Sequence, residues 1–148
     1  MSKGGALDGF VPVGVRRPTR KRAEATPTEA QEQEALFLWA ERAKGRYPAL
    51  GMLFHIPNGG SRNLLEAAHL KAQGVKPGVP DICLPVPSGK FSALYIEMKR
   101  RKHAEISENQ RGWIEALNRV GNLAVVCYGW DEAREALVEY LKGGEGMK

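Results

Sequence analysis

Two acidic residues and a lysine fall within a stretch whose residue types predict a hairpin of two β-strands. Asp81 begins a short apolar segment at 82–84, and Glu97 and Lys99 lie in the longer aromatic and aliphatic segment 91–99. Because side chains alternate along a strand, Glu97 and Lys99 share one face. Charges in an otherwise apolar strand are costly unless they meet a partner, a metal or water. We therefore expect the three side chains to meet in one cleft.

These residue types suit the metal-assisted hydrolysis of a phosphodiester. Two neighbouring carboxylates repel each other, and a divalent cation such as Mg²⁺ or Mn²⁺ removes the repulsion and acts as a Lewis acid. A lysine beside the cation can position water or offset the charge that develops on the phosphate. The alternative is structural. An aspartate that begins a strand is often a turn residue, and a Glu-x-Lys pair is often a solvated ion pair.

The same residues resemble a known family signature. Pro80-Asp81 followed by Glu97-Met98-Lys99 is similar to the PD-(D/E)XK nuclease motif, and the surrounding motifs resemble the VRR-NUC branch of that superfamily over residues 28–141. The further motifs are His55-Ile56-Pro57-Asn58-Gly59-Gly60, Gly74-Val75-Lys76-Pro77-Gly78-Val79-Pro80-Asp81, Ile96-Glu97-Met98-Lys99, and Ser107 with Gln110.

The resemblance implies an α/β fold with a restriction-endonuclease-like core, in which a small mixed β-sheet is flanked by helices on both faces. It also implies DNA cleavage that depends on Mg²⁺ or Mn²⁺. Small stand-alone members, many from phages, resemble structure-specific endonucleases that resolve four-way (Holliday) junctions as homodimers. Three alternatives remain: a flap, end-trimming or single-strand DNA nuclease, a restriction-type enzyme, and a catalytically silent nucleic-acid-binding module.

A third carboxylate is expected from the helix that follows Thr28. Thr28 and Gln31 match a capping box at its start. The resemblance expects a glutamate in a Glu-Gln pair early in this helix, which Glu32 and Gln33 match, so Glu32 is the expected metal ligand and Glu34 the alternative. Either acid could instead be a first-turn residue that the helix dipole favours.

Gln110 has two interpretations. It completes a capping box with Ser107, and the resemblance places it at the border of the active site, where it would orient water or phosphate. The expected catalytic residues are Asp81, Glu97, Lys99 and Gln110, and the expected metal ligands are Asp81, Glu97 and Glu32.

Two stretches are candidates for contacts with the DNA backbone. A glycine-rich turn that leads into a helix offers free backbone N–H groups to a phosphate, although Asn-Gly is also common turn chemistry. The resemblance favours DNA binding by Asn58, Gly59 and Arg62. Arg100 and Arg101 lie in the basic run that follows the second strand of the hairpin.

Hydrophobic periodicity and turn residues predict the elements around the hairpin. A helix is expected at 62–73, with an N-cap and an inward apolar face. Its cap is Ser61 and its inward residues are Leu64, Leu65, Ala68 and Ala72. A strand at 123–127 is expected to be buried on both faces. The other expected elements are a helix from Thr28 to about Ala43, a strand at 51–56, a helix from Ser107 that ends at Gly121, and a helix from Trp130 and Asp131.

The composition indicates one globular domain inside the cell. The chain has 148 residues, of which 43% are hydrophobic, enough for a single core. No apolar run approaches the ~20 residues of a membrane span, and the N-terminus lacks an apolar signal-peptide core. Cys83 and Cys127 lie in apolar segments and are expected to be buried. The spacing of the cysteines and histidines predicts no zinc site. No small-molecule cofactor is expected.

Positive charge is concentrated near the N-terminus. The net charge is +5, and residues 1–26 hold six Lys or Arg against two Asp or Glu, leaving 16 and 15 in the rest of the chain. Such a tail can contact phosphates without reading sequence, or it can be a solvated disordered end. The expected organisation is a disordered basic tail at 1–27, a nuclease domain at 28–142 and a flexible tail at 143–148.

Overall fold

The computed structural model describes residues 25–57, 63–102 and 104–146. The helices are α1 (Glu29–Ala43), the 3₁₀ helix η1 (Pro48–Met52), α2 (Leu64–Ala72), α3 (Glu108–Arg119) and α4 (Trp130–Gly146), and the strands are β1 (Phe54–His55), β2 (Ile82–Leu84), β3 (Leu94–Lys99) and β4 (Leu123–Tyr128). None of the helices in this part of the chain is long and apolar enough to cross a membrane.

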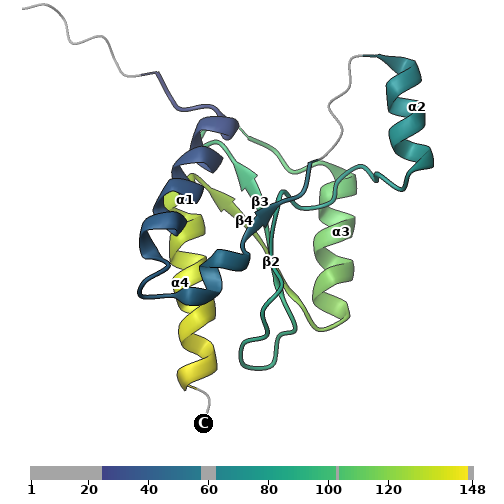
Figure 1. The fold of residues 1–148 in the computed structure, drawn as a ribbon. Coiled ribbons are helices and arrows are strands. Elements are labelled where there is room, and N and C mark those ends of the chain that lie inside the picture. Colours follow the sequence, from purple (N-terminus) through teal and green to yellow (C-terminus); the bar gives the residue numbers. More distant parts are fainter. Residues whose placement is uncertain (1–24, 58–62, 103, 147–148) are drawn as a thin grey trace, which may run out of the picture.

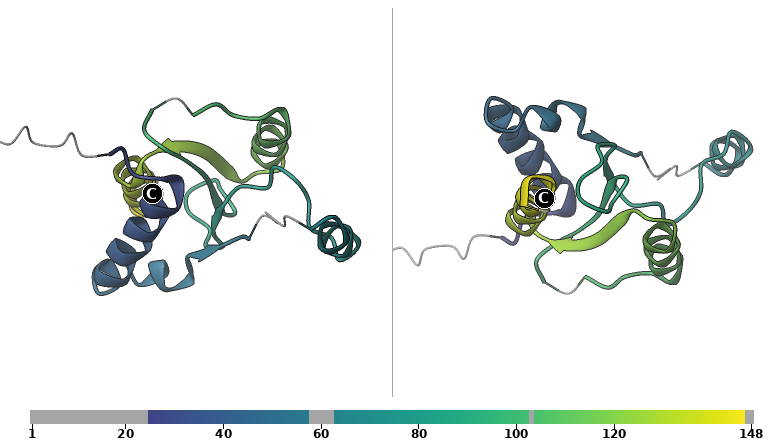
Figure 2. Two further views of the ribbon diagram at one scale, coloured as in Figure 1. Left: turned by 90° about the horizontal axis from the view of Figure 1, so that it is seen from above. Right: turned by 90° about the horizontal axis from the view of Figure 1, so that it is seen from below.

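One mixed sheet forms the centre of the fold, in the strand order β1-β2-β3-β4. β1 and β3 are both antiparallel to β2, whereas β3 and β4 are parallel and are joined by α3. α1 and α4 cover one face of the sheet and α3 covers the other (Figure 1 and Figure 2). The prediction of an α/β fold with a small mixed sheet and helices on both faces is confirmed.

β2 and β3 form the predicted hairpin. Their register pairs Ile82 with Ile96, and continuing it by one residue places Asp81 beside Glu97. β3 begins at Leu94, so residues 91–93, which were expected to be strand, lie in the connection. The largest side chains that are fully buried include Leu36, Ile82, Leu84, Leu94, Ile96, Met98 and Leu137.

The region before β2 differs from the prediction. Residues 51–56 were expected to form one strand, but Pro48 begins a 3₁₀ helix and only two residues pair as β1. Proline suits the first turn of a helix, because it has no N–H to leave unpaired there. Leu53 of this segment and Leu50 just before it are buried in the core, whereas Met52 and Phe54 are exposed.

α2 forms as predicted but lies apart from the sheet (Figure 1). Leu64 and Leu65, expected to face inward, are 89% and 68% exposed, and α2 contains no buried residue. Its N-cap is Asn63, whose side chain accepts the Leu65 N–H at 2.9 Å, and not Ser61. The apolar periodicity predicted a helix here, but it carries no information on which surface the helix would meet.

β4 and α4 also differ in detail from the sequence prediction. β4 is an edge strand. Ala124 and Cys127, whose side chains point to opposite faces of the sheet, are buried, and the other four residues are half-buried, so both faces are covered but less completely than expected. α4 continues through Gly146, beyond residue 143, where a flexible tail was expected to begin. Cys83 and Cys127 are buried free cysteines, as predicted.

Candidate active site

The ends of β2 and β3 position the first two acidic residues. Asp81 directly precedes β2, and its Oδ2 accepts the Met98 backbone N–H at 2.8 Å. Its carbonyl oxygen accepts the Ile56 N–H at 2.7 Å and lies 2.7 Å from Nδ1 of His55. Asp81 is therefore held by strands on both sides, with its carboxylate directed toward Glu97.

A third carboxylate comes from the first residue of α1. Glu29, Asp81 and Glu97 each offer a carboxylate oxygen, and these oxygens lie within 4.8 Å of one another. The predicted capping box of α1 is confirmed, since Thr28 Oγ1 accepts the Gln31 N–H and Gln31 Oε1 accepts the Thr28 N–H. This local cap orients the first turn of α1 and so sets the direction of the Glu29 side chain.

The three carboxylates lie close enough to perturb one another. Burial raises the pKa of Glu97 to about 8, repulsion from Asp81 adds to the shift, and the Lys99 ammonium opposes it. Burial and Asp81 also raise the pKa of Glu29. Lys99 Nζ lies 3.6 Å from Glu97 Oε1, and both side chains are nearly inaccessible to solvent. The three carboxylates are thus not neutralised by the protein, because among the described residues they have one lysine as their positively charged neighbour.

Gln110 completes the predicted capping box and also contacts Glu97, while its expected role in orienting water or phosphate stays a prediction. Its Oε1 accepts the Ser107 N–H at 2.9 Å and completes the capping box of α3. Its Nε2 donates to Glu97 Oε1 at 2.7 Å. One side chain therefore joins the start of α3 to the buried glutamate of β3.

The loop before β2 is pinned to the same helix. Trp113 Nε1 donates to the Pro77 carbonyl at 3.1 Å. Gly78 has φ +86°, and a Cβ placed on it would lie 2.5 Å from the Asn109 carbonyl carbon and 2.7 Å from the Gln110 nitrogen. Only glycine permits this close approach, which places α3 where Gln110 can reach the acidic group.

The donor set fits a divalent cation. Glu97 is only 1% exposed, and its buried Oε2 has no hydrogen-bond partner among the described residues. Gln110 and Lys99 both approach the other oxygen, Oε1. Three carboxylates with a free buried oxygen supply the hard oxygen ligands that Mg²⁺ and Mn²⁺ prefer.

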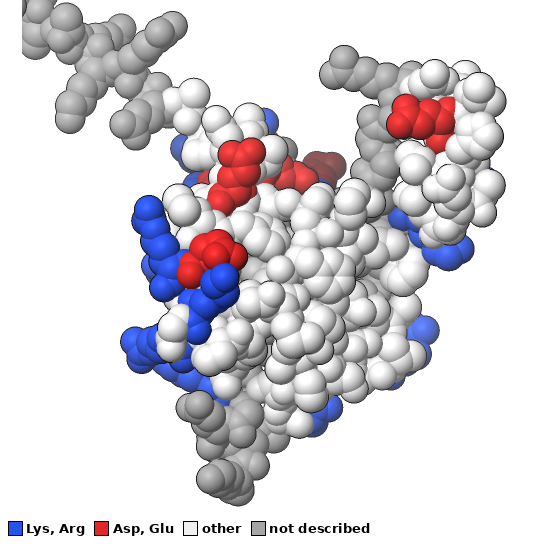
Figure 3. All heavy atoms as spheres, in the orientation of Figure 1, with Lys and Arg blue, Asp and Glu red and all other residues white. Residues whose placement is uncertain are grey.

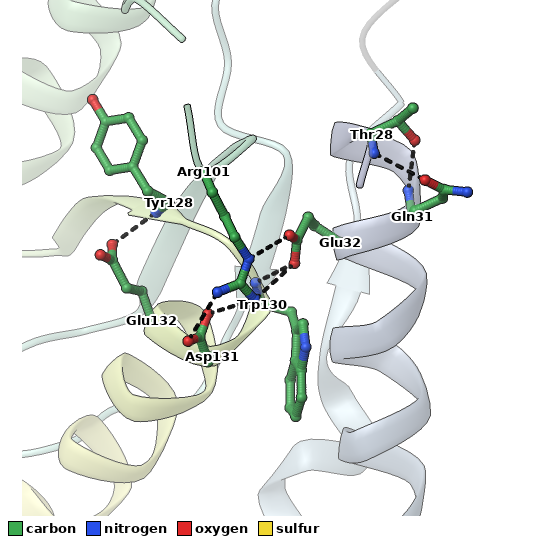
Figure 4. Close-up of polar contacts among 8 residues, drawn as sticks. All are labelled: Thr28, Gln31, Glu32, Arg101, Tyr128, Trp130, Asp131 and Glu132. Atoms are coloured by element: carbon green, nitrogen blue, oxygen red, sulfur yellow. Dashed lines mark hydrogen bonds and ion pairs between the residues drawn. The ribbon is translucent and has the colours of Figure 1, made fainter. Parts of the chain in front are cut away.

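The structure does not bring Glu32 into this group. Its carboxylate accepts the Arg101 Nε–H and the Trp130 backbone N–H, each at 2.8 Å (Figure 4). The exposed candidate Glu34 also lies outside the acidic group. Glu29 takes the place in that group that was expected for Glu32.

The sequence carried a signal for Glu29 that was missed. Leu36 and Ala40 form the buried stripe of α1, and stepping back seven residues from Leu36 reaches Glu29 on the same helix face. Glu32 lies on this face too, so periodicity alone leaves both glutamates eligible.

The five residues that were expected to contact DNA lie in different surroundings or outside the described residues. Asn58, Gly59 and Arg62 lie outside the described residues. Arg100 and Arg101 are both exposed, but the guanidinium of Arg101 is held by carboxylates of the protein itself. Figure 3 shows acidic side chains at the end of the body where α1 begins.

A mixed sheet with carboxylates and a lysine at its strand ends is the arrangement of a restriction-endonuclease-like nuclease. The family model of the VRR-NUC domain matches residues 24–131. The chain therefore belongs to the VRR-NUC family, and this family membership implies a nuclease of that fold.

Comparison with solved structures gives the same assignment. A VRR_NUC domain protein shares 32% sequence identity and a TM-score of 0.71 with this chain, and the match covers 81% of this chain and 93% of the other. None of the curated proteins matches the chain.

Proposed function

We propose that this protein is a metal-dependent endonuclease that hydrolyses phosphodiester bonds in branched DNA, with a four-way junction as substrate and a homodimer as the active form. The observation that carries the proposal is the meeting of Glu29, Asp81 and Glu97 around a buried, unpaired carboxylate oxygen. Of the three, Glu97 is buried, Asp81 half-buried and Glu29 exposed. A buried carboxylate beside two others is unfavourable by itself, so the position of Glu97 is best explained by a cation that the three residues bind.

Each residue of the site has a role in this proposal. Asp81, Glu97 and Glu29 would hold Mg²⁺ or Mn²⁺, which when bound supplies Lewis-acid activation of water and phosphate. Lys99 directs its ammonium group toward Glu97 Oε1, where it can orient the attacking water and stabilise charge on the phosphate. Gln110 holds Glu97 in the orientation that leaves Oε2 free.

The end of the sheet that carries this group also suits a polyanion. α1, α3 and α4 all begin there, at the end where β3 and β4 finish (Figure 1). Helix N-termini carry partial positive charge and favour phosphate. The exposed Arg100 adds a full charge. Asn58, Gly59 and Arg62 remain proposed backbone contacts.

The junction substrate and the homodimer rest on the resemblance to small stand-alone members of the family. The described residues contain one acidic group of this kind. Two symmetric cuts across a four-way junction would then require two copies of the chain.

The test is cleavage of a labelled four-way junction beside linear duplex, flap and single-stranded DNA, in Mg²⁺, Mn²⁺ or EDTA. We expect paired symmetric cuts in the junction that require metal and are lost in Glu97→Ala. Metal-dependent cutting of flap or single-stranded DNA with the junction spared would retain the nuclease but reject the junction. Binding without cleavage in any metal would favour a silent binding module.

A further inference from the structure

A second buried glutamate lies one turn along α1 from the acidic group, in a cluster formed by Glu32, Arg101, Asp131 and the backbone N–H of Trp130. We call this the Arg101 cluster. Arg101 Nε donates to Glu32 Oε1 at 2.8 Å, and Nη1 donates to Asp131 Oδ2 at 3.2 Å. The Trp130 N–H donates to Glu32 Oε2 at 2.8 Å. Figure 4 shows the guanidinium between the two carboxylates.

The backbone around the cluster is shaped to accept the guanidinium. Gly129 has φ +88°, and a Cβ on it would lie 3.0 Å from Cζ of Arg101 and 2.9 Å from Oδ1 of Asp131. The Gly129 N–H donates to the Lys99 carbonyl at 2.9 Å, which ties the end of β3 to the start of α4. The guanidinium fork thus fits a defined space, which the single ammonium of lysine would not fill in the same way.

Both ends of the Glu32–Arg101 contact adjoin the proposed active site along the chain. Glu32 follows Glu29 by one helical turn, and Arg101 follows Lys99 by two residues. Glu29 comes from α1, whereas Glu97 and Lys99 come from β3, and their relative position depends on how α1 docks against the end of β3. The Arg101 cluster joins these two elements beside the site. Its glutamate is buried, whereas the side chains of Arg101 and Asp131 are 40% and 44% exposed.

We propose that the Arg101 cluster is a positioning device that sets the separation of Glu29 from Glu97 and Lys99, and that Glu32 and Arg101 thereby determine metal affinity without touching the metal. This inference rests on the proposed function, because it concerns the same acidic group. Polar groups behind metal ligands commonly affect affinity in this way, and their loss weakens metal binding about 10-fold to 100-fold.

The sign of one measurement separates this role from an electrostatic one. Removing Arg101 deletes a positive charge from the end of the sheet that carries the acidic group, which by Coulomb attraction alone would leave cation binding unchanged or strengthen it. A positioning role predicts the opposite, because Glu32 is released and α1 is free to shift. The experiment is Mn²⁺ titration of the full-length protein without DNA, with free Mn²⁺ followed by electron paramagnetic resonance.

We expect Arg101→Ala and Glu32→Gln to weaken Mn²⁺ binding by about tenfold. Arg101→Lys retains the charge but loses the fork, and we expect it to weaken binding as well, so it carries the test if Arg101→Ala fails to fold. The matched control is Arg134→Ala. Its guanidinium lies 5.2 Å from the centroid of the Trp130 ring, so it removes the same charge from the same end of α4. The control should bind Mn²⁺ at least as tightly as the wild type.

The outcomes distinguish a positioning role of Arg101 from a purely structural role and from failure of the proposed metal site. Unchanged or tighter Mn²⁺ binding by folded Arg101→Ala or Arg101→Lys would overturn the positioning role. A purely structural role would lower the melting temperature and leave the Mn²⁺ affinity of the folded protein unchanged, which also overturns it. If wild-type binding is absent, or equal in Glu97→Ala, the proposed metal site itself fails and the inference fails with it.

Discussion

Glu97 and Glu32 are equally hidden from solvent, each with 1% of its surface exposed, yet they occupy opposite electrostatic surroundings. Glu32 has a guanidinium and a helix N–H on its two oxygens. Glu97 has a neutral amide and a lysine at 3.6 Å on one oxygen, two carboxylates nearby, and no hydrogen-bond donor among the described residues on the other oxygen. Two buried glutamates on neighbouring elements therefore differ in one respect. The described residues supply hydrogen-bond donors to both carboxylate oxygens of Glu32 but to only one of Glu97.

The difference distinguishes a structural charge from a functional one. A buried carboxylate that meets its own cation stabilises a particular docking of elements, provided both partners are present. A buried carboxylate left short of positive charge has a raised pKa and an unfilled coordination position, which is the condition expected at a site that binds an external cation. Four kinds of experiment test whether Glu97 and Glu32 differ in this way.

The largest expected effect is on cleavage. Glu97→Gln should reduce single-turnover DNA cleavage at saturating Mg²⁺ about a thousandfold, since it removes a proposed ligand. Glu32→Gln should cost about tenfold, as expected of a residue that acts through its neighbours. Equal losses in the two variants would place Glu32 in the chemistry and remove the contrast.

Gly78→Ala should disrupt the support of Glu97 without changing any charge. The added Cβ would lie 2.5 Å from Asn109, and displacement of α3 would pull Gln110 from Glu97. The control is Gly74→Ala, which has a similar φ of +97° but nothing within 4 Å of its Cβ.

Urea unfolding and cleavage would be measured for both glycine variants. Gly78→Ala should lose about 2 kcal/mol more stability than Gly74→Ala, the typical cost of overpacking. It should also lose more activity. Similar behaviour of the two would show that the approach of α3 to this loop is dispensable.

The stability of the metal-free protein should depend on pH through Glu97. Its folded-state pKa of about 8 lies above the ordinary value of 4.5, so ionisation costs folding free energy as pH rises through that window. In EDTA, Glu97→Gln should therefore be more stable than the wild type at pH 8, by roughly 1–2 kcal/mol.

That advantage should shrink at pH 5, where folded Glu97 already holds a proton. Urea unfolding at the two pH values would measure it, and excess Mn²⁺ should reverse the order at pH 8 by binding the folded wild type. A difference that is the same at both pH values would argue against the raised pKa.

The smallest expected effect concerns the two adjacent arginines. Arg100 is exposed, so Arg100→Ala should reduce the slope of log K against log salt for DNA binding by about 0.9, the value for one lost phosphate contact. Arg101→Ala should leave that slope unchanged, because its guanidinium is held by Glu32 and Asp131. Fluorescence anisotropy of a labelled junction in EDTA, over a range of salt, would measure both slopes. A reduced slope for Arg101→Ala would make it a DNA contact after all.

Interactions between residues close in the chain were predictable from the sequence. Each of the two capping boxes joins residues three positions apart, and both formed as expected. Strand alternation placed Glu97 and Lys99 on one face, and the hairpin brought Asp81 to them, because a short connection leaves few ways to pair two strands. The motifs of the family supplied the remaining information on fold and activity.

Only the tertiary structure decided which of the two glutamates of α1 joins the acidic group. Glu29 and Glu32 lie on one helix face and have the same chemistry, so neither periodicity nor residue type separates them. Glu32 accepts hydrogen bonds from Arg101, 69 residues away, and from Trp130, 98 residues away. Contacts across such separations depend on how the helices dock on the sheet. That docking is set by the packing of the whole core, which a local pattern does not record.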